Sequence, residues 1–155
     1  MLDAQHTRSL TTLKAWKKLK QSNKYSATKQ EVLRNLKVEF TWIGGYMWVD
    51  SRNGHLIINT NYLNKGDKID IYLDLIHELV HTRQFLQGRE LFDERYSYID
   101  RPTEIEAYRH AVKEARRIGL PDERICQYLK TEWMNKQDLQ KLAATLKVNC
   151  IRNND

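Results

Sequence analysis

The stretch DKIDIYLDLIHELVHTRQFLQG, residues 67–88, decides how the rest of this chain is interpreted. It predicts one long helix, because Asp67 suits the start of a helix, Gly88 suits its end, and no proline interrupts it. Apolar side chains recur along it at helical spacing, at positions 69, 73, 76 and 80. We therefore expect this helix to be mostly buried.

Residues 77–81 of that helix read His-Glu-Leu-Val-His. Side chains four residues apart lie on one helix face, with their Cβ atoms about 5–6 Å apart. His77 and His81 can therefore both reach one Zn²⁺ at about 2.0–2.1 Å. Glu78 lies on the same side, where it is placed to act as a general base on a water. The same five letters also arise by chance, so a third ligand further along the chain is needed.

A second helix is predicted to begin at Pro102 and to end near Gly119. Glu104 would lie in its first turn, where the backbone N–H groups favour an ionised carboxylate. Such an acid is also a common choice at a helix start without any metal. We take Glu104 as the third ligand, with Glu106 and then His110 as alternatives.

This combination resembles the gluzincin metallopeptidases, which carry His-Glu-x-x-His on one helix and Glu-x-x-Ala on the next. The resemblance covers residues from about 36 to 118, and small minigluzincins and repressor-cleaving metalloproteases of mobile elements and stress responses are the most similar members. It implies that His77, His81 and Glu104 bind zinc, and that Ala107 is small because the two helices pack closely.

One position departs from the gluzincin pattern. Many gluzincins carry an Asp four residues after the ligand Glu, and it braces a ligand histidine. This chain has Tyr108 there. The bracing acceptor must then come from elsewhere, with Asp74, Asp100 or a backbone carbonyl as candidates.

The function implied is that of a zinc metallopeptidase acting on a peptide or protein substrate. The metal would lower the pKa of a water toward ~7, and Glu78 would take its proton and pass it to the leaving amine. A further donor should stabilise the oxyanion. Its candidates are Tyr96, Tyr98, Tyr108 and His110, of which we favour a tyrosine and take Tyr108. Two alternatives stay open: a non-catalytic zincin-like binding or regulatory module, and a metal-dependent hydrolase of another substrate.

The expected fold is α+β and zincin-like, with a small antiparallel sheet packed on the metal-binding helix between N-terminal and C-terminal helices. Residues 38–43 and 46–49 are predicted to form a hairpin around Gly44-Gly45, and residues 55–59 another strand. Either 46–49 or 55–59 would be the edge strand along the cleft, where an extended peptide can add by backbone hydrogen bonds.

The C-terminal third is predicted to be helical over residues 121–130 and 135–147, with Trp133 and Met134 anchoring the break between them. Residues 149–155 are expected to form a frayed tail. Cys126 and Cys150 show neither metal-ligand spacing nor a disulfide framework, so we expect two thiols in a reduced, cytoplasmic protein.

Length and composition predict one domain over residues 1–155, divided into a basic helical arm (1–37), a sheet with the metal helices (38–118) and C-terminal helices (119–148). No apolar run approaches the ~20 residues that cross a membrane, and the start of the chain lacks a secretory apolar stretch.

The net charge of +6 is concentrated in the arm, where nine Lys and Arg residues stand against two acids. Residues 9–20 predict an amphipathic helix, and Thr28 with Glu31 predicts a capping box that opens a second short helix. Three roles for the arm stay open. It would pack on the sheet with its lysines in water, bind nucleic acid or an acidic partner, or cover the cleft or mediate a homodimer.

Overall fold

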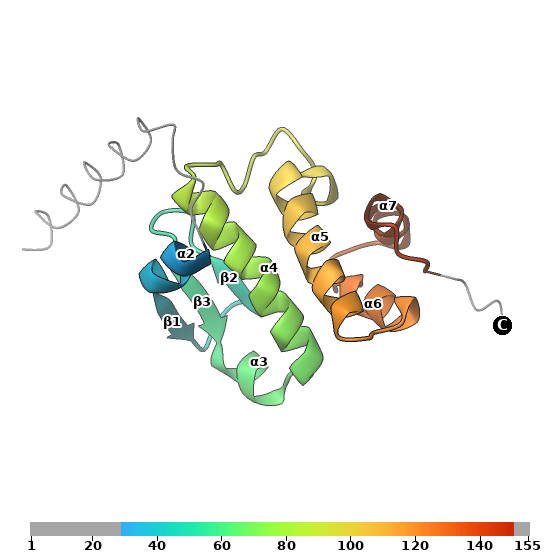
Figure 1. The fold of residues 1–155 in the computed structure, drawn as a ribbon, viewed down its shortest axis with the longest axis horizontal. Coiled ribbons are helices and arrows are strands. Elements are labelled where there is room, and N and C mark those ends of the chain that lie inside the picture. The colour runs from blue at the N-terminus through green and yellow to red at the C-terminus, as the bar shows by residue number, and fades with distance from the viewer. Residues whose placement is uncertain (1–28, 151–155) are drawn as a thin grey trace, which may run out of the picture.

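The computed structural model describes residues 29–150, so residues 1–28, with most of the basic arm, and residues 151–155 lie outside the described residues. The described part is α+β, as predicted (Figure 1). Its elements in chain order are α2 (Lys29–Asn35), β1 (Val38–Thr41), β2 (Met47–Val49), β3 (Leu56–Asn59), α3 (Thr60–Lys65), α4 (Lys68–Leu86), η1 (Tyr98–Asp100), α5 (Pro102–Arg117), α6 (Asp122–Leu129) and α7 (Lys136–Leu146).

The three strands form a mixed sheet of order β1-β3-β2, in which β3 runs parallel to β1 and antiparallel to β2. The predicted antiparallel sheet, with a hairpin between residues 38–43 and 46–49, is therefore wrong. The tight connection is the one between β2 and β3, where the Asp50 carbonyl accepts from the Gly54 N–H at 2.7 Å. Gly54 has a φ of +74°, and a Cβ there would lie 2.3 Å from the Phe85 ring. This turn occupies one side of β3, which leaves the other side for β1.

Because β3 is the central strand, residues 55–59 cannot be the edge strand along a cleft, and β2 is an edge strand. All four residues of β3 are buried. Met47 and Val49 of β2 share an apolar cluster with Leu56 and Ile58 of β3, and side chains of α4 pack against this cluster. Figure 1 shows α4 between the sheet and α5.

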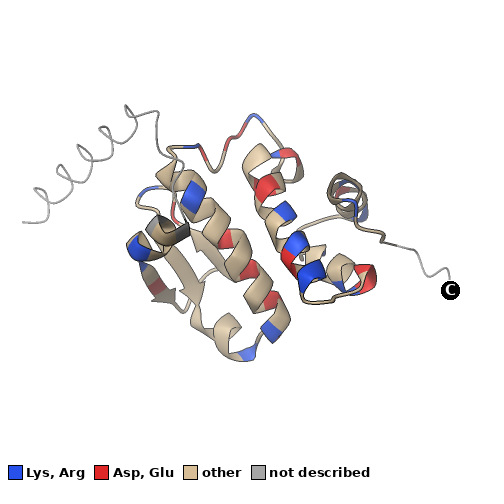
Figure 2. Cartoon of the chain, viewed as in Figure 1, with Lys and Arg blue, Asp and Glu red and all other residues tan. Residues whose placement is uncertain are grey.

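The two predicted metal-bearing helices form as expected. Asp67 caps α4, because its carboxylate accepts the N–H groups of Ile69 and Asp70. Pro102 begins α5. Ala107 is fully buried in this helix pair, which fits a small residue at a close helix contact. Figure 2 shows acidic positions along the middle of α4 with basic positions toward its two ends, whereas both signs occur along α5.

The helices α5, α6 and α7 surround a second apolar cluster, to which α4 contributes Leu73. No helix within residues 29–150 combines the length and the apolar character needed to cross a membrane. Helix α3, which the sequence pattern did not predict, begins after Asn59, whose side-chain oxygen accepts the N–H groups of Asn61 and Tyr62.

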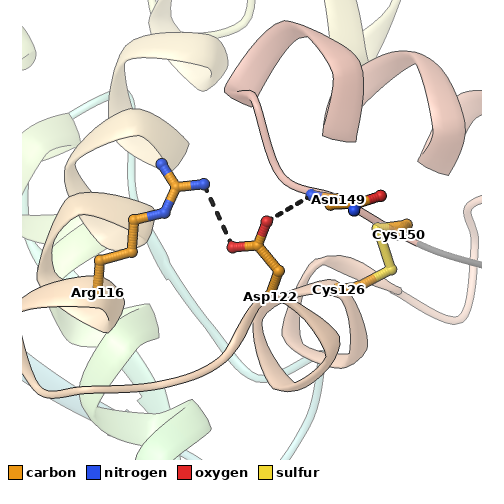
Figure 3. Close-up of a disulfide and its surroundings, with 5 residues drawn as sticks. All are labelled: Arg116, Asp122, Cys126, Asn149 and Cys150. Carbon is orange, nitrogen blue, oxygen red and sulfur yellow. Dashed lines mark hydrogen bonds and ion pairs between the residues drawn. A yellow bond between two sulfur atoms is a disulfide. The ribbon is translucent and has the colours of Figure 1, made fainter.

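Cys126 and Cys150 form a disulfide between α6 and the segment after α7, with Cα atoms 5.5 Å apart (Figure 3). The expectation of two free thiols is therefore wrong, and it no longer supports a cytoplasmic location. Local spacing failed here because the partners are brought together by helix packing, 24 residues apart in the chain.

The segment after α7 is held in place up to residue 150, so the predicted fraying from residue 149 is wrong for residues 149 and 150. Lys147 turns the chain in a left-handed conformation, and Val148 is buried. The Asn149 N–H donates to the Asp122 carboxylate at 2.7 Å, and Arg116 donates to the same carboxylate at 3.3 Å and to the Lys147 carbonyl at 2.6 Å. Figure 3 shows the Asp122 carboxylate between Arg116 and Asn149.

Candidate metal centre

The four residues predicted to carry the chemistry lie together in the interior. His77, Glu78 and His81 come from the middle of α4, and Glu104 comes from the first turn of α5. Each of the four has 8% or less of its surface exposed. Buried polar groups of this kind are costly unless they are paired or bind an ion.

The atoms of three of these residues converge on one point. The two Nε2 atoms of His77 and His81 are 3.0 Å apart. Oε2 of Glu104 lies 3.2 Å from the first nitrogen and 3.4 Å from the second. Two ligands bound to one zinc at about 2.0–2.1 Å in tetrahedral geometry are about 3.3 Å apart. The separations therefore fit two nitrogens and one oxygen around a single ion.

Glu78 also belongs to the group, because it shares with His77 and His81 ligand atoms that all lie within 4.8 Å of one another. Glu104 makes the closer approach to the histidines, which favours Glu104 over Glu78 as the third ligand. The geometry thus leaves Glu78 beside the site rather than in the ligand triangle.

The two alternative ligands lie elsewhere. The Glu106 carboxylate accepts from Arg83 at 2.7 Å, from Gln84 at 2.9 Å and from Arg89. His110 is exposed on α5, where its ring contacts Arg83 at 3.5 Å.

The surroundings of Glu104 and His77 favour their deprotonated forms, which are the forms that bind a metal. Burial alone would raise the pKa of Glu104, but hydrogen bonds from His77 and His81 lower it to about 2. Burial lowers the pKa of His77. Burial also acts against the charged form of His81, but the hydrogen bond to Glu104 and the nearby Glu78 raise its pKa overall. A cation in the triangle would therefore compete with a proton for Nε2 of His81.

Glu78 has the opposite shift. Burial raises its pKa to about 8, although His81 and the backbone N–H of Val49 act in the lowering direction. A carboxyl group with a raised pKa next to two metal-type ligands can exchange a proton near neutral pH.

The residues that hold the two histidines differ from the predicted ones. Nδ1 of His81 lies 2.8 Å from Oε1 of Gln84, a fully buried residue that the motif did not single out. Its position three residues after His81, on the same helix face, is the pattern from which it could have been found. Nδ1 of His77 has no hydrogen-bond partner within residues 29–150.

Neither of the two carboxylates predicted to hold His77, those of Asp74 and Asp100, bonds to its Nδ1 atom. The Asp74 carboxylate accepts from the Tyr62 hydroxyl at 2.6 Å. Asp100 pairs with Lys141 and Ser97. Instead the Tyr108 ring, at the position where many gluzincins carry Asp, packs against the His77 ring with centroids 4.4 Å apart.

A cavity of about 250 Å³ opens beside the four residues. Residues 45–49, which include β2, line it, together with His77, Glu78, His81, Leu91, Phe92, Tyr98, Glu104 and Trp133. None of these lining residues, among the part of the chain that the structure describes, is Lys or Arg.

The predicted tyrosines differ in their position relative to this cavity. Tyr98 lines the cavity, and its hydroxyl lies 2.9 Å from that of Tyr108. Tyr108 is buried behind His77 and does not line the cavity. Tyr96 is exposed. Burial raises the pKa of both Tyr98 and Tyr108, so both hydroxyls keep their protons at neutral pH.

Comparisons of the chain with protein-family models, with curated proteins and with solved structures found no match. What the site can do is therefore argued from its residues.

Proposed function

We propose that the protein is a zinc-dependent metallopeptidase of the gluzincin type, with His77, His81 and Glu104 as the metal ligands. The observation that carries the proposal is the triangle of two histidine nitrogens and one carboxylate oxygen, with sides of 3.0, 3.2 and 3.4 Å. Two imidazoles and a carboxylate are a usual ligand set for catalytic zinc. When bound, zinc supplies a positive charge that polarises a carbonyl group and acidifies water.

Glu78 is the general base in this proposal. Its carboxylate lies next to the ligands, lines the cavity and has a pKa of about 8. It takes a proton from water as the water attacks, and then gives that proton to the leaving amine. Both transfers need a group whose pKa is near the working pH.

Tyr98 is the oxyanion donor in this proposal, in place of Tyr108. The donor must reach the space where the substrate carbonyl lies, and Tyr98 lines that space while Tyr108 does not. Its pKa is raised, so the hydroxyl is available to donate. Tyr108 then supports both Tyr98 and His77 through its hydroxyl and its ring.

The substrate is an internal stretch of polypeptide. The N–H of Asn59 donates to the carbonyl of Tyr46, and the N–H of Asp50 donates to the carbonyl of His55. The backbone groups of residues 46 and 50 therefore point toward β3. The backbone groups of Met47 then face the edge of β2 that pairs with no other strand within residues 29–150, because directions alternate along a strand. An extended peptide can add there. The aromatic lining residues favour apolar side chains, and no lining cation within residues 29–150 is present to hold a terminal carboxylate.

Glu78→Gln tests the proposal. Elemental mass spectrometry should find near-stoichiometric zinc in the wild type and in the variant. The variant should lose hydrolysis of internally quenched peptides, because the amide cannot take a proton. Glu90→Gln, at an exposed position, is the matched control and should cleave at the wild-type rate.

Zinc-dependent cleavage that Glu78→Gln leaves unchanged would contradict the role of Glu78. A wild-type protein that takes up no zinc would contradict the metal centre itself. That second result would favour the non-catalytic module, whose basic arm lies mostly outside residues 29–150.

A further inference from the structure

Two hydrogen bonds on the side away from His81 fix the orientation of the Gln84 side-chain amide. Gln84 is fully buried. Its Nε2 atom lies 3.0 Å from the backbone carbonyl of Thr103 and 2.9 Å from Oε2 of Glu106. Both of these partners only accept hydrogen bonds, so the amide nitrogen, with its two protons, must face them. The amide oxygen therefore faces the opposite side.

That opposite side is occupied by His81, whose Nδ1 atom lies 2.8 Å from Oε1 of Gln84. An amide oxygen can only accept, so Nδ1 of His81 must carry the proton. In the neutral ring, Nε2 then bears a lone pair, and this is the atom that lies in the triangle with His77 and Glu104.

Glu106 is held in turn by two arginines. Arg83 donates to its Oε1 at 2.7 Å, and Arg89 donates to its Oε2. The chain of contacts thus runs from two arginines through Glu106 and Gln84 to His81. It joins α4 to α5 directly behind the ligand triangle.

We propose that Gln84 is a positioning residue for the metal, which fixes His81 in its Nδ1–H tautomer, and that Glu106 sets the direction of the Gln84 amide. The proposal rests on the metal centre of the proposed function. It also implies an asymmetry between the ligands, because in the described part of the chain Nδ1 of His77 has no such partner. The tautomer of His77 is then set by the metal, and that of His81 by the protein.

Gln84→Leu tests this, because leucine fills much of the same volume without a hydrogen-bonding group. Zinc affinity, measured by competition with a chromophoric chelator, should fall about 10- to 100-fold, the usual effect of losing a ligand's outer partner. Gln87→Leu is the matched control, since Gln87 is exposed and follows three residues later, directly after the end of α4.

The second readout needs no zinc. Long-range ¹H–¹⁵N spectra of the metal-free protein, at a pH where its imidazoles are neutral, should show His81 as the Nδ1–H tautomer. Glu106→Gln can offer a donor to Gln84 and let its amide turn over, so this variant should show a mixture. It also serves if Gln84→Leu does not fold.

A wild-type His81 in the Nε2–H form would overturn the proposal, as would unchanged zinc affinity in folded Gln84→Leu. If the wild type binds no zinc at all, the proposed function fails, while the tautomer measurement still decides the role of Gln84.

Discussion

Glu104 and Glu106 are two residues apart on α5, yet their carboxylates have opposite surroundings. Glu104 meets two imidazoles in the interior, whereas Glu106 meets Arg83, Arg89 and Gln84. The Glu-x-x-Ala pattern favours Glu104 but leaves Glu106 as an alternative, because both lie near the start of a helix that follows the His-Glu-x-x-His motif. Side chains two apart on a helix point in different directions, and only the packing of α4 on α5 decides which one faces the histidines.

We expect Glu104→Gln to lose zinc. The amide is nearly the same size as the carboxylate but carries no charge, so the triangle loses its anionic ligand. Elemental mass spectrometry after dialysis should fall from about one zinc per chain to a small fraction. Glu94→Gln, at an exposed position in the loop before η1, should keep its zinc. Full zinc retention in Glu104→Gln would remove Glu104 from the ligand set.

The two tyrosines allow a second residue-level prediction. Tyr98→Phe should lower kcat about 10²- to 10³-fold with little change in KM, the usual effect of losing an oxyanion donor. Tyr108→Phe should have a smaller effect, because Tyr108 does not line the cavity and the variant keeps the ring that packs on His77, losing only the hydroxyl contact with Tyr98. Steady-state kinetics of both variants decide the order, and a larger loss in Tyr108→Phe would contradict our assignment.

Among the elements, the longer helices could be predicted from the sequence, whereas the short helix α3 and the pairing of the strands could not. Helix α4 begins and ends where Asp67 and the glycine at 88 predict, because caps and apolar spacing are local features. The sheet order depends on which strand fills each side of β3, and nothing local encodes it. The sequence pattern predicts the hairpin at Gly44-Gly45, whereas in the structure the hairpin closes between β2 and β3 at the Gly54 turn.

Gly54→Ala tests that turn. The φ of +74° disfavours any residue with a Cβ, and the added atom would lie 2.3 Å from the Phe85 ring. We expect a loss of about 2–4 kcal/mol in the free energy of unfolding, measured by urea titration. Gly45→Ala is the control, because a Cβ there meets nothing within 4 Å, and it should change the free energy by less than about 1 kcal/mol. Equal losses in both variants would argue against this account of the turn.

At the scale of the whole molecule, the described chain has two apolar clusters joined by α4. One lies between the sheet and α4, and the other lies among α5, α6 and α7. The ligand triangle lies where the two meet, since it takes residues from α4 and from α5. The disulfide lies in the second cluster only.

Replacing Cys126 and Cys150 together with Ser should lower the free energy of unfolding by about 3 kcal/mol, the size expected for a cross-link that closes a loop of about 25 residues. Thermal unfolding of the variant, and of the wild type with and without reductant, measures this. Zinc affinity should stay unchanged, because neither cysteine lines the cavity. Release of zinc on adding reductant would contradict this and show that the metal centre depends on the disulfide.

In the proposed zinc-bound form, coordination would join residue 77 to residue 104, while the disulfide joins 126 to 150, and these two loops share no residue. After a protease cut between 87 and 101, a chelator would remove the coordination link between the two fragments and leave only the contacts between α4 and α5. A cut between α6 and α7 would leave fragments that separate only after reduction. The molecule would thus have two independent cross-links, one removed by a chelator and the other by a reductant.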